Sequence, residues 1–400
     1  MPKRSRLYVA VAVLIAGLLG LAVALPRLPA LALIVRVSKR PGVLGWLARL
    51  PAGKVTEGPV VEVPTRHGPV PGRLYRKHRS ARRTIILVPG LHMDGLHEAR
   101  LVGLAKELAA TGPQVLTLAP PDLTQYRVTP RTVDEMEDAI AWAAARPDLA
   151  PDGKVGLTAF SFAGGLALVA AGRSTVNDNL AFVLSFGGHG DLPRVLRYLC
   201  GEATPLPVSR AEASTLAYGG EEIRIPPPHD YGAVAALLNL ADRIVPGPQV
   251  APLQEAVTLF LRASSIDRQD RGRAETIFAR ARQLGQAMPE PSRTLMRYVS
   301  DRDVAHLGRV LEPRLTALDL PAALSPERSP LPRVPVFLLH GAADSVIPAS
   351  EMLALARRLR AASRVRAFAS QLITHAEADR RAALAEMWSL SAFWGDLLSR

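Results

Sequence analysis

The sequence predicts an α/β protein with a doubly wound, mostly parallel sheet, an inserted helical unit and a membrane-spanning helix at the N-terminus. Three observations predict this. Short β-branched runs alternate with amphipathic helical patterns, a long stretch without strand signals interrupts that alternation, and residues 7–25 carry no charge. Of the 400 residues, 48% are hydrophobic and 21% charged, so the chain is too apolar to be disordered and long enough for a large core.

The N-terminus has the pattern of a membrane anchor. Residues 7–25 follow a basic start, and as a helix they would be about 28 Å long, close to the roughly 30 Å of a bilayer core. A second apolar piece covers residues 28–35. A cleaved signal peptide is the alternative, because Ala22-Val23-Ala24 has the small-x-small form that signal peptidase recognises. We expect a retained single-pass anchor within residues 1–40, with the folded domain outside the cytoplasm.

From about residue 60 the pattern becomes that of a globular α/β domain. Apolar, β-branched runs predict strands at 60–63, 84–88, 115–118, 155–158, 181–185, 334–339 and 365–369. Helical patterns lie between several of them, including one around residues 133–144 that is opened by a capping box from Thr132 to Glu135. Such alternation indicates a parallel sheet covered on both faces, and we assign it to residues 60–190 and 330–400.

The alternation breaks between residues 191 and 329. This stretch has no strong strand signal, and its helical patterns fall around 230–243, 252–264, 269–285 and 302–317. Proline-rich segments separate the helical patterns. We expect residues 191–329 to form a helical cap inserted into the sheet domain.

Charge and cysteine content exclude several kinds of protein. With 49 basic and 36 acidic residues the net charge is +13, which would suit an anionic partner. Nearly all the basic residues are arginine, however, which GC-rich codon usage explains equally well. The densest basic cluster, residues 73–83, has the pattern of a solvated connection and lacks interleaved stacking aromatics, so we expect no nucleic-acid binding. The single cysteine, Cys200, excludes an intramolecular disulfide and a cysteine-based metal cluster.

The stretch TAFSFAGG, residues 158–165, points to a nucleophilic serine. Ser161 follows a predicted strand and precedes a helix start rich in small residues. That is the context of a nucleophile elbow, a sharp turn that exposes the serine oxygen while the helix N-terminus offers amide donors to an oxyanion. Ala159 and Ala163 replace the glycines of the common G-x-S-x-G form, and an incidental serine in a turn of small residues is the structural alternative.

A second segment supplies oxyanion donors. LVPGLHMDG, residues 87–95, ends a strand with Pro89-Gly90, so the amide of Leu91 is expected to face the same pocket as the amide of Phe162. The neighbouring polar residues of this loop, His92, Asp94 and His97, are assigned no chemistry.

A carboxylate and a histidine complete the set. Asp344 follows a predicted strand at the carboxyl edge of the sheet, where an acid that orients a histidine belongs, and His375 follows the last predicted strand. The rival acid is Asp191, which follows the strand at 181–185. Structural roles in the cap or its hinge are expected for His189 and His229.

Taken together, these segments resemble those of α/β-hydrolase-fold enzymes. The carriers are LVPG at 87–90, AFSFAGG at 159–165, HGAADSVIP at 340–348 and the pair Thr374-His375. The elbow alanines depart from the common pattern, as does a proline before Gly90 where many members have histidine, and these departures leave the subfamily open.

The resemblance implies a role for each residue. Ser161 is the nucleophile, His375 the general base and then acid, and Asp344 the group that fixes the histidine tautomer. The backbone amides of Leu91 and Phe162 form the oxyanion hole.

The expected function is that of a membrane-anchored serine hydrolase that cleaves a carboxylic ester. The helical cap would shape an apolar acyl pocket, and a lipid-like ester would suit an anchor that keeps the site near a bilayer. No cofactor or metal is expected. An acyltransferase, peptidase or thioesterase with the same triad is the alternative, as is a non-catalytic binding protein with this fold.

Overall fold

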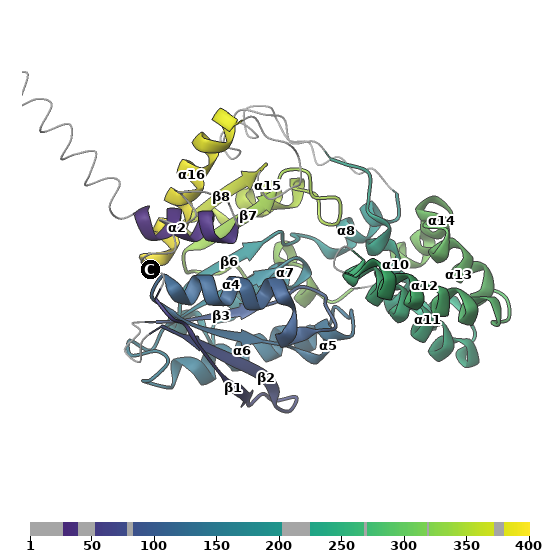
Figure 1. The fold of residues 1–400 in the computed structure, drawn as a ribbon, viewed down its shortest axis with the longest axis horizontal. Coiled ribbons are helices and arrows are strands. Elements are labelled where there is room, and N and C mark those ends of the chain that lie inside the picture. Colours follow the sequence, from purple (N-terminus) through teal and green to yellow (C-terminus); the bar gives the residue numbers. More distant parts are fainter. Residues whose placement is uncertain are drawn as a thin grey trace, which may run out of the picture.

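The computed structural model describes residues 27–38, 53–77, 83–201, 225–267, 270–317, 320–371 and 380–400. At its centre is an eight-stranded sheet in the order β1-β2-β4-β3-β5-β6-β7-β8 (Figure 1). The strands are β1 (Thr56–Val63), β2 (Val70–Arg76), β3 (Thr84–Val88), β4 (Gln114–Leu118), β5 (Val155–Phe160), β6 (Leu180–Phe186), β7 (Val336–Gly341) and β8 (Val365–Ser370). β2 runs antiparallel to both β1 and β4, and every later pairing is parallel.

All seven predicted strands are confirmed, with bounds shifted by a few residues. The structure adds β2, which the sequence analysis missed. The expected solvated connection at residues 73–83 is therefore wrong in its first part, because Arg73 and Arg76 lie in this strand. Arg73 pairs with Glu57 of the neighbouring strand at 2.7 Å, and Arg76 lies 3.8 Å from Asp148.

Helices cover both faces of the sheet, as predicted. In β3, Ile85 and Leu87 belong to one apolar cluster, whereas Ile86 and Val88 belong to the other. The first face packs against α2 (Leu28–Val37), α4 (Ala99–Ala110) and α16 (Arg380–Leu398), and the second against α6 (Pro130–Ala144), α7 (Phe162–Gly172) and α15 (Ser350–Leu359). The short α5 (Pro121–Thr124) and the 3-10 turns Gly95–His97, Asn177–Asn179, Ala322–Leu324 and Pro326–Arg328 lie in connections.

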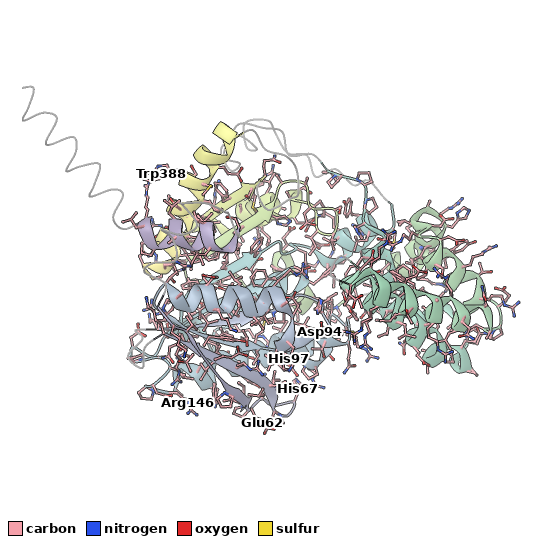
Figure 2. All side chains as sticks on the ribbon, in the orientation of Figure 1. Glu62, His67, Asp94, His97, Arg146 and Trp388 are labelled. Carbon is pink, nitrogen blue, oxygen red and sulfur yellow. The ribbon has the colours of Figure 1, made fainter. Side chains whose placement is uncertain are left out.

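The second apolar piece of the N-terminus is part of this folded unit. It forms α2, which packs beside α16 and α4 (Figure 1) and buries Leu33 in the core. Its Arg36 forms an ion pair with Glu107 of α4. Trp388, labelled on α16 in Figure 2, has the guanidinium of Arg27 4.8 Å from its ring centre.

The predicted membrane span, residues 7–25, lies outside the described residues, as does the possible signal-peptidase site. Within the parts of the chain that the structure describes, no helix is long and apolar enough to cross a membrane.

The described parts of residues 191–329 contain helices and no strand. The helices are α8 (Leu192–Leu199), α10 (Asp230–Ile244), α11 (Gly247–Ile266), α12 (Arg271–Gln286), α13 (Ser292–Ser300) and α14 (Val304–Thr316). The last five form a lobe at one side of the sheet (Figure 1). The root of this lobe is held by Arg194 of α8, which pairs with Glu327 at 2.7 Å and with Glu351 of α15 at 2.5 Å.

The start of α6 differs from the prediction. The helix begins at Pro130 with Thr129 as N-cap residue, so the predicted capping box is wrong and Thr132 lies buried inside the helix. Proline is favoured as the first helical residue because its fixed φ suits the helix and its missing N–H would have had no partner there. Glu135 instead pairs with Arg131 at 2.7 Å.

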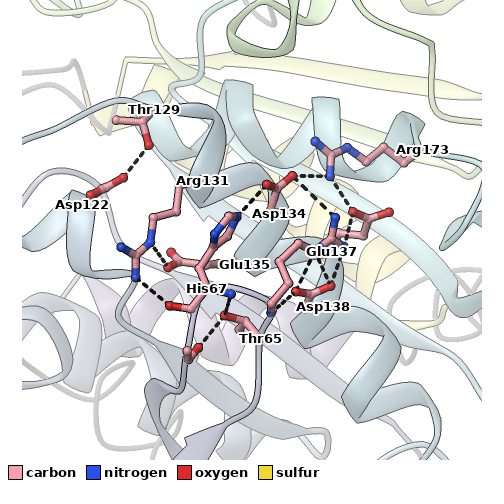
Figure 3. A network of polar contacts seen from close by, with 12 residues as sticks. Thr65, His67, Asp122, Thr129, Arg131, Asp134, Glu135, Glu137, Asp138 and Arg173 are labelled. Atoms are coloured by element: carbon pink, nitrogen blue, oxygen red, sulfur yellow. Dashed lines mark hydrogen bonds and ion pairs between the residues drawn. The ribbon is translucent and has the colours of Figure 1, made fainter.

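An ion-pair network fastens α6 to its surroundings (Figure 3). Arg66, in the turn between β1 and β2, pairs with Asp138 at 2.5 Å and with Glu137 at 2.7 Å. Arg173, which follows α7, pairs with Asp134 at 2.7 Å and with Glu137 at 2.5 Å. The network therefore ties the antiparallel edge of the sheet to the helix that begins at the candidate nucleophile.

Candidate active site

Ser161 stands at the sharp turn between β5 and α7. Its φ of 54° and ψ of −135° fall in a region that residues with a side chain rarely adopt. Its N–H donates to the carbonyl of Phe186, at the end of β6, at 2.8 Å, and its carbonyl accepts from Gly164 N–H at 2.8 Å. The strained backbone is thus held from both sides, and the side chain is half-buried.

Small residues around the turn are required by close packing. Ala159 and Ala163 are fully buried. A β-carbon at Gly164 would lie 2.7 Å from Oγ of Ser185 and 3.1 Å from Cα of Gly188. The first turn of α7 therefore rests directly on the end of β6, which leaves no room for a larger side chain at residue 164.

The loop after β3 lies against the serine. A β-carbon at Gly90 would be 3.1 Å from Cβ of Ser161 and 3.8 Å from its Oγ. The amide of Leu91 comes next in the chain, and the amide of Phe162 belongs to the first turn of α7, whose N–H groups have no partner within the helix. Neither amide donates a hydrogen bond to another described residue. These two amides are therefore the candidate oxyanion donors.

Asp344 lies at the same edge of the sheet, after β7. Its Oδ1 accepts hydrogen bonds from the amides of Val346 at 2.8 Å and Ile347 at 3.1 Å. Its Oδ2 accepts none from the described residues, and a β-carbon at Gly187 would lie 3.6 Å from it. Because Gly187 directly follows Phe186, which holds the backbone of Ser161, the carboxylate and the serine lie on either side of the end of β6.

Asp191 has both carboxylate oxygens occupied. Its Oδ1 accepts from the amide of Arg194 at 2.9 Å as the N-cap of α8, and its Oδ2 accepts from Arg328 at 2.7 Å. The side chain is buried at the root of the lobe. These contacts account for Asp191 as a structural residue and favour Asp344 as the acid.

His375 lies outside the described residues. The strand before it, β8, pairs in parallel with β7, so that Ser370 is opposite Gly341 and the chain leaves the sheet at the edge where Asp344 lies. His375 is four residues beyond Gln371, and four residues of chain can span up to about 14 Å.

Three histidines other than His375, namely His189, His92 and His229, have local partners. His189 is fully buried, and burial lowers its pKa, so that a neutral ring faces the carbonyl of Leu324 with 2.8 Å from Nε2 to oxygen. Burial likewise lowers the pKa of His92, whose Nδ1 accepts from the amide of Asp94 at 3.3 Å. His229 is the N-cap of α10. Asp94 and His97 lie in the loop between β3 and α4 (Figure 2). Among the described residues, no group of three His, Cys, Asp or Glu side chains could hold a metal ion.

Two tyrosines near the site were missed by the sequence analysis. Tyr231 of α10 donates its hydroxyl to the carbonyl of Leu91 at 3.0 Å. Tyr198 of α8 donates to the carbonyl of Pro226 at 2.7 Å, and burial together with the charge of Asp344 raises its pKa. Neither tyrosine has a local sequence signature, because each meets its partner only through the tertiary fold.

The strand order, with β2 antiparallel and helices on both faces, is that of the α/β-hydrolase fold. The candidate serine follows β5 and the candidate acid follows β7. The chain therefore has the α/β-hydrolase fold, and the resemblance predicted from the sequence is confirmed at this level.

Remote similarity to solved structures is found. A Pyrobaculum calidifontis esterase is 16% identical with a TM-score of 0.43, and the alignment covers 93% of this chain and 90% of that one. Brefeldin A esterase, described as a bacterial homologue of human hormone sensitive lipase, is 13% identical with a TM-score of 0.42, covering 94% and 86%. A Pyrococcus horikoshii acylaminoacyl peptidase is 12% identical with a TM-score of 0.41, covering 90% of this chain and 44% of that one.

No protein-family model and no curated protein matches the chain. Because the similarities to solved structures are so distant, they carry no weight for the activity, and the fold assignment rests on the strand order.

Proposed function

We propose that the protein is a serine hydrolase that cleaves a carboxylic ester through an acyl-enzyme on Ser161. The observation that carries this proposal is the backbone of Ser161, held at a φ of 54° between a strand and a helix with Gly90 close to its side chain. A turn of this kind costs free energy and persists only where its surroundings enforce it, which is typical of a nucleophile elbow.

The proposed reaction has two steps. Oγ of Ser161 attacks the ester carbonyl carbon while the imidazole of His375 takes the hydroxyl proton, and the negative charge on the former carbonyl oxygen is stabilised by the amides of Leu91 and Phe162. Collapse of this intermediate breaks the bond to the alcohol, which leaves with the proton from His375. Water then attacks the acyl-enzyme by the same route and releases the acid and the free serine.

Asp344 would accept a hydrogen bond from the imidazole through Oδ2. Its Oδ1 is already fixed by the amides of Val346 and Ile347, so the carboxylate has a defined orientation before the histidine arrives. Such an acid holds the histidine tautomer and stabilises the imidazolium that forms during attack.

A lipid-like ester is the proposed substrate class, and residues 7–25 are the proposed membrane anchor, with the catalytic domain outside the cytoplasm. The length and lack of charge of residues 7–25 support the anchor. An anchored site would meet substrates that partition into the bilayer at a raised local concentration.

Covalent labelling tests the proposal directly. The detergent-solubilised chain is treated with a fluorophosphonate probe and its mass is measured, for wild type, Ser161→Ala and a matched control, Ser185→Ala. Ser185 is a buried serine beside the elbow, and its hydroxyl has no proposed role. The Ser185→Ala variant should therefore still be labelled at Ser161. Labelling that persists in Ser161→Ala, or a well-folded wild type that takes no label with probes of any size, would contradict the proposal.

Product analysis then separates hydrolysis from acyl transfer. With a panel of esters of increasing acyl length, a hydrolase gives free acid in the presence of added alcohols, whereas a transferase gives the new ester. Turnover that rises with acyl length supports the lipid-like substrate class, and turnover confined to short acyl chains contradicts it.

A further inference from the structure

The first turn of α10 bridges the two loops that carry the candidate catalytic groups. The amide of His229, at its N-terminus, donates to the carbonyl of Ser345 at 2.8 Å. Ser345 is the residue after Asp344. Two residues further along, the hydroxyl of Tyr231 donates to the carbonyl of Leu91 at 3.0 Å. A cap helix thus contacts the acid loop on one side of Ser161 and the oxyanion loop on the other.

The peptide unit after Leu91 is held at both of its polar ends. Tyr231 binds the carbonyl of Leu91, and the N–H of the same unit, from His92, donates to the carbonyl of Leu123 at 3.2 Å. These two bonds fix the orientation of the chain immediately after the candidate donor amide. On the other side of the Leu91 amide, the close approach of Gly90 to Ser161 restricts movement of the chain.

Tyr231 is itself held in place as a donor. Its ring packs edge-on against Tyr126, with 6.2 Å between ring centres. α10 also binds the backbone of Tyr126, because the side-chain amide of Asn239 donates to the carbonyl of Tyr126 at 2.9 Å. Burial raises the pKa of Tyr231, so its hydroxyl keeps its proton throughout the pH range of an assay.

We propose that Tyr231 is a positioning residue for the oxyanion hole, through which the docked cap holds the amide of Leu91 in place. This inference rests on the proposed function. It makes the cap part of the catalytic apparatus as well as a wall of the substrate pocket, since the oxyanion hole is fully ordered only when α10 lies on the sheet domain.

The expected effect follows from the distance dependence of oxyanion stabilisation. A donor amide acts at 2.7–3.1 Å from the oxyanion, and complete loss of one donor lowers kcat by roughly 10²- to 10³-fold. Without the Tyr231 hydroxyl, the Leu91 loop keeps its bond to Leu123 and its contact with Ser161. The loss should therefore be partial, about 10- to 100-fold.

Tyr231→Phe tests the inference, with Tyr126→Phe as its matched control. The control removes a hydroxyl from the same tyrosine pair and leaves the bond to Leu91 intact. The first measurement is the second-order rate constant for fluorophosphonate labelling of Ser161, in which an oxyanion-like phosphoryl oxygen develops. We expect it to fall about 10- to 100-fold in Tyr231→Phe and to change less than about threefold in Tyr126→Phe.

The second measurement separates positioning from general destabilisation. An activated aryl ester and its thiono analogue, with sulfur in place of the carbonyl oxygen, are compared in each variant. Amide donors stabilise an oxyanion more than a thiolate, so a displaced donor lowers the ratio of ester to thionoester turnover and affects kcat more than KM. Because the ratio does not depend on how much protein is folded, it remains informative if Tyr231→Phe is poorly stable.

Labelling and ratio both unchanged in Tyr231→Phe would overturn the inference while leaving the proposed function intact. If Tyr231→Phe labels more slowly but has an unchanged ratio of ester to thionoester turnover and a raised KM, the inference is also overturned. Such a result is expected of a residue that binds the substrate rather than one that positions the oxyanion hole. If the folded wild type neither reacts with the fluorophosphonate nor turns over an ester, both the proposed function and this inference are overturned. Measurements on the wild type alone distinguish this outcome from the other two.

Discussion

Replacing Ser161 with glycine should make the protein more stable and inactive at the same time. The φ of 54° and ψ of −135° at Ser161 lie where only glycine is comfortable. A serine held there is strained by contacts of its Cβ with its own backbone, and glycine has no Cβ. The matched variant is Ser161→Ala, which keeps Cβ and its strain but lacks the nucleophilic oxygen.

The magnitude follows from two opposing terms. A residue held in such a region costs roughly 1–3 kcal/mol. Glycine in turn loses more backbone freedom on folding, which offsets roughly 0.5–1 kcal/mol of the gain. Ser161→Gly should therefore exceed Ser161→Ala in free energy of unfolding by about 1 kcal/mol, and by up to about 2 kcal/mol if the strain is at the upper end of its range.

The assay is denaturant unfolding of the detergent-solubilised chain, followed by tryptophan fluorescence, with turnover measured on the same samples. Both variants should lose activity by several orders of magnitude because both lack Oγ. Equal stability of the two variants would refute the idea that strain is stored at the elbow. Substantial residual turnover in either variant would remove Ser161 from the proposed mechanism.

Further tests concern the candidate acid, the root of the lobe and the ion-pair network around α6. Asp344→Asn should fold and lose activity by about 10⁴-fold, whereas Asp191→Asn should act mainly on stability; the reverse pattern in turnover per folded molecule would reassign the acid. Glu351→Ala should lower the free energy of unfolding by about 3–5 kcal/mol, because the buried carboxylate pairs with an arginine and accepts two amides; denaturant midpoints within error of wild type would contradict this. Burial alone would raise the pKa of Asp138, but the hydrogen bonds and charge of Arg66 lower it. The folded chain therefore binds fewer protons at this site than the unfolded chain does. The resulting gain in stability is present above about pH 4 and is lost as pH falls. Arg66→Ala should therefore cost stability at pH 7 and progressively less towards pH 2, and a loss that does not change with pH would argue against the pairing.

The fold was largely predictable because parallel strands in such a sheet are buried on both faces. β3 and β4 are buried at every position, so apolar residues predominate in both and little polar alternation interrupts them. β2 escaped notice for the opposite reason. It is an antiparallel strand near the edge, it carries Pro71 and Gly72, and its fully buried side chains are separated by exposed or half-buried ones. Charged residues within it resemble a loop unless the pairing with β1 is known.

The candidate site was predictable only where local backbone determines it. The small residues around Ser161 are visible in the sequence, and they indicate a sharp turn because close packing, as at Gly164, excludes larger side chains. Asp191 and Asp344 both follow strands, and the sequence favours Asp344 only through its local strand-Gly-Asp-helix context. The structure adds that both carboxylate oxygens of Asp191 accept hydrogen bonds from Arg194 and Arg328. Tyr231 lies far from Leu91 in the chain, and nothing near it in sequence signals the contact.

The N-terminus shows why apolar composition alone does not identify a membrane segment. Residues 7–25 and 28–35 are both apolar, yet the second forms α2 and is packed into the core beside α16. If residues 7–25 span a bilayer as proposed, only Pro26 and Arg27 separate the span from a helix that is fixed to the sheet domain. The folded unit would then be held close to the membrane surface with little freedom to reorient. The stacked pair of Arg27 and Trp388 would lie near the lipid headgroups, where tryptophan and basic side chains are favoured.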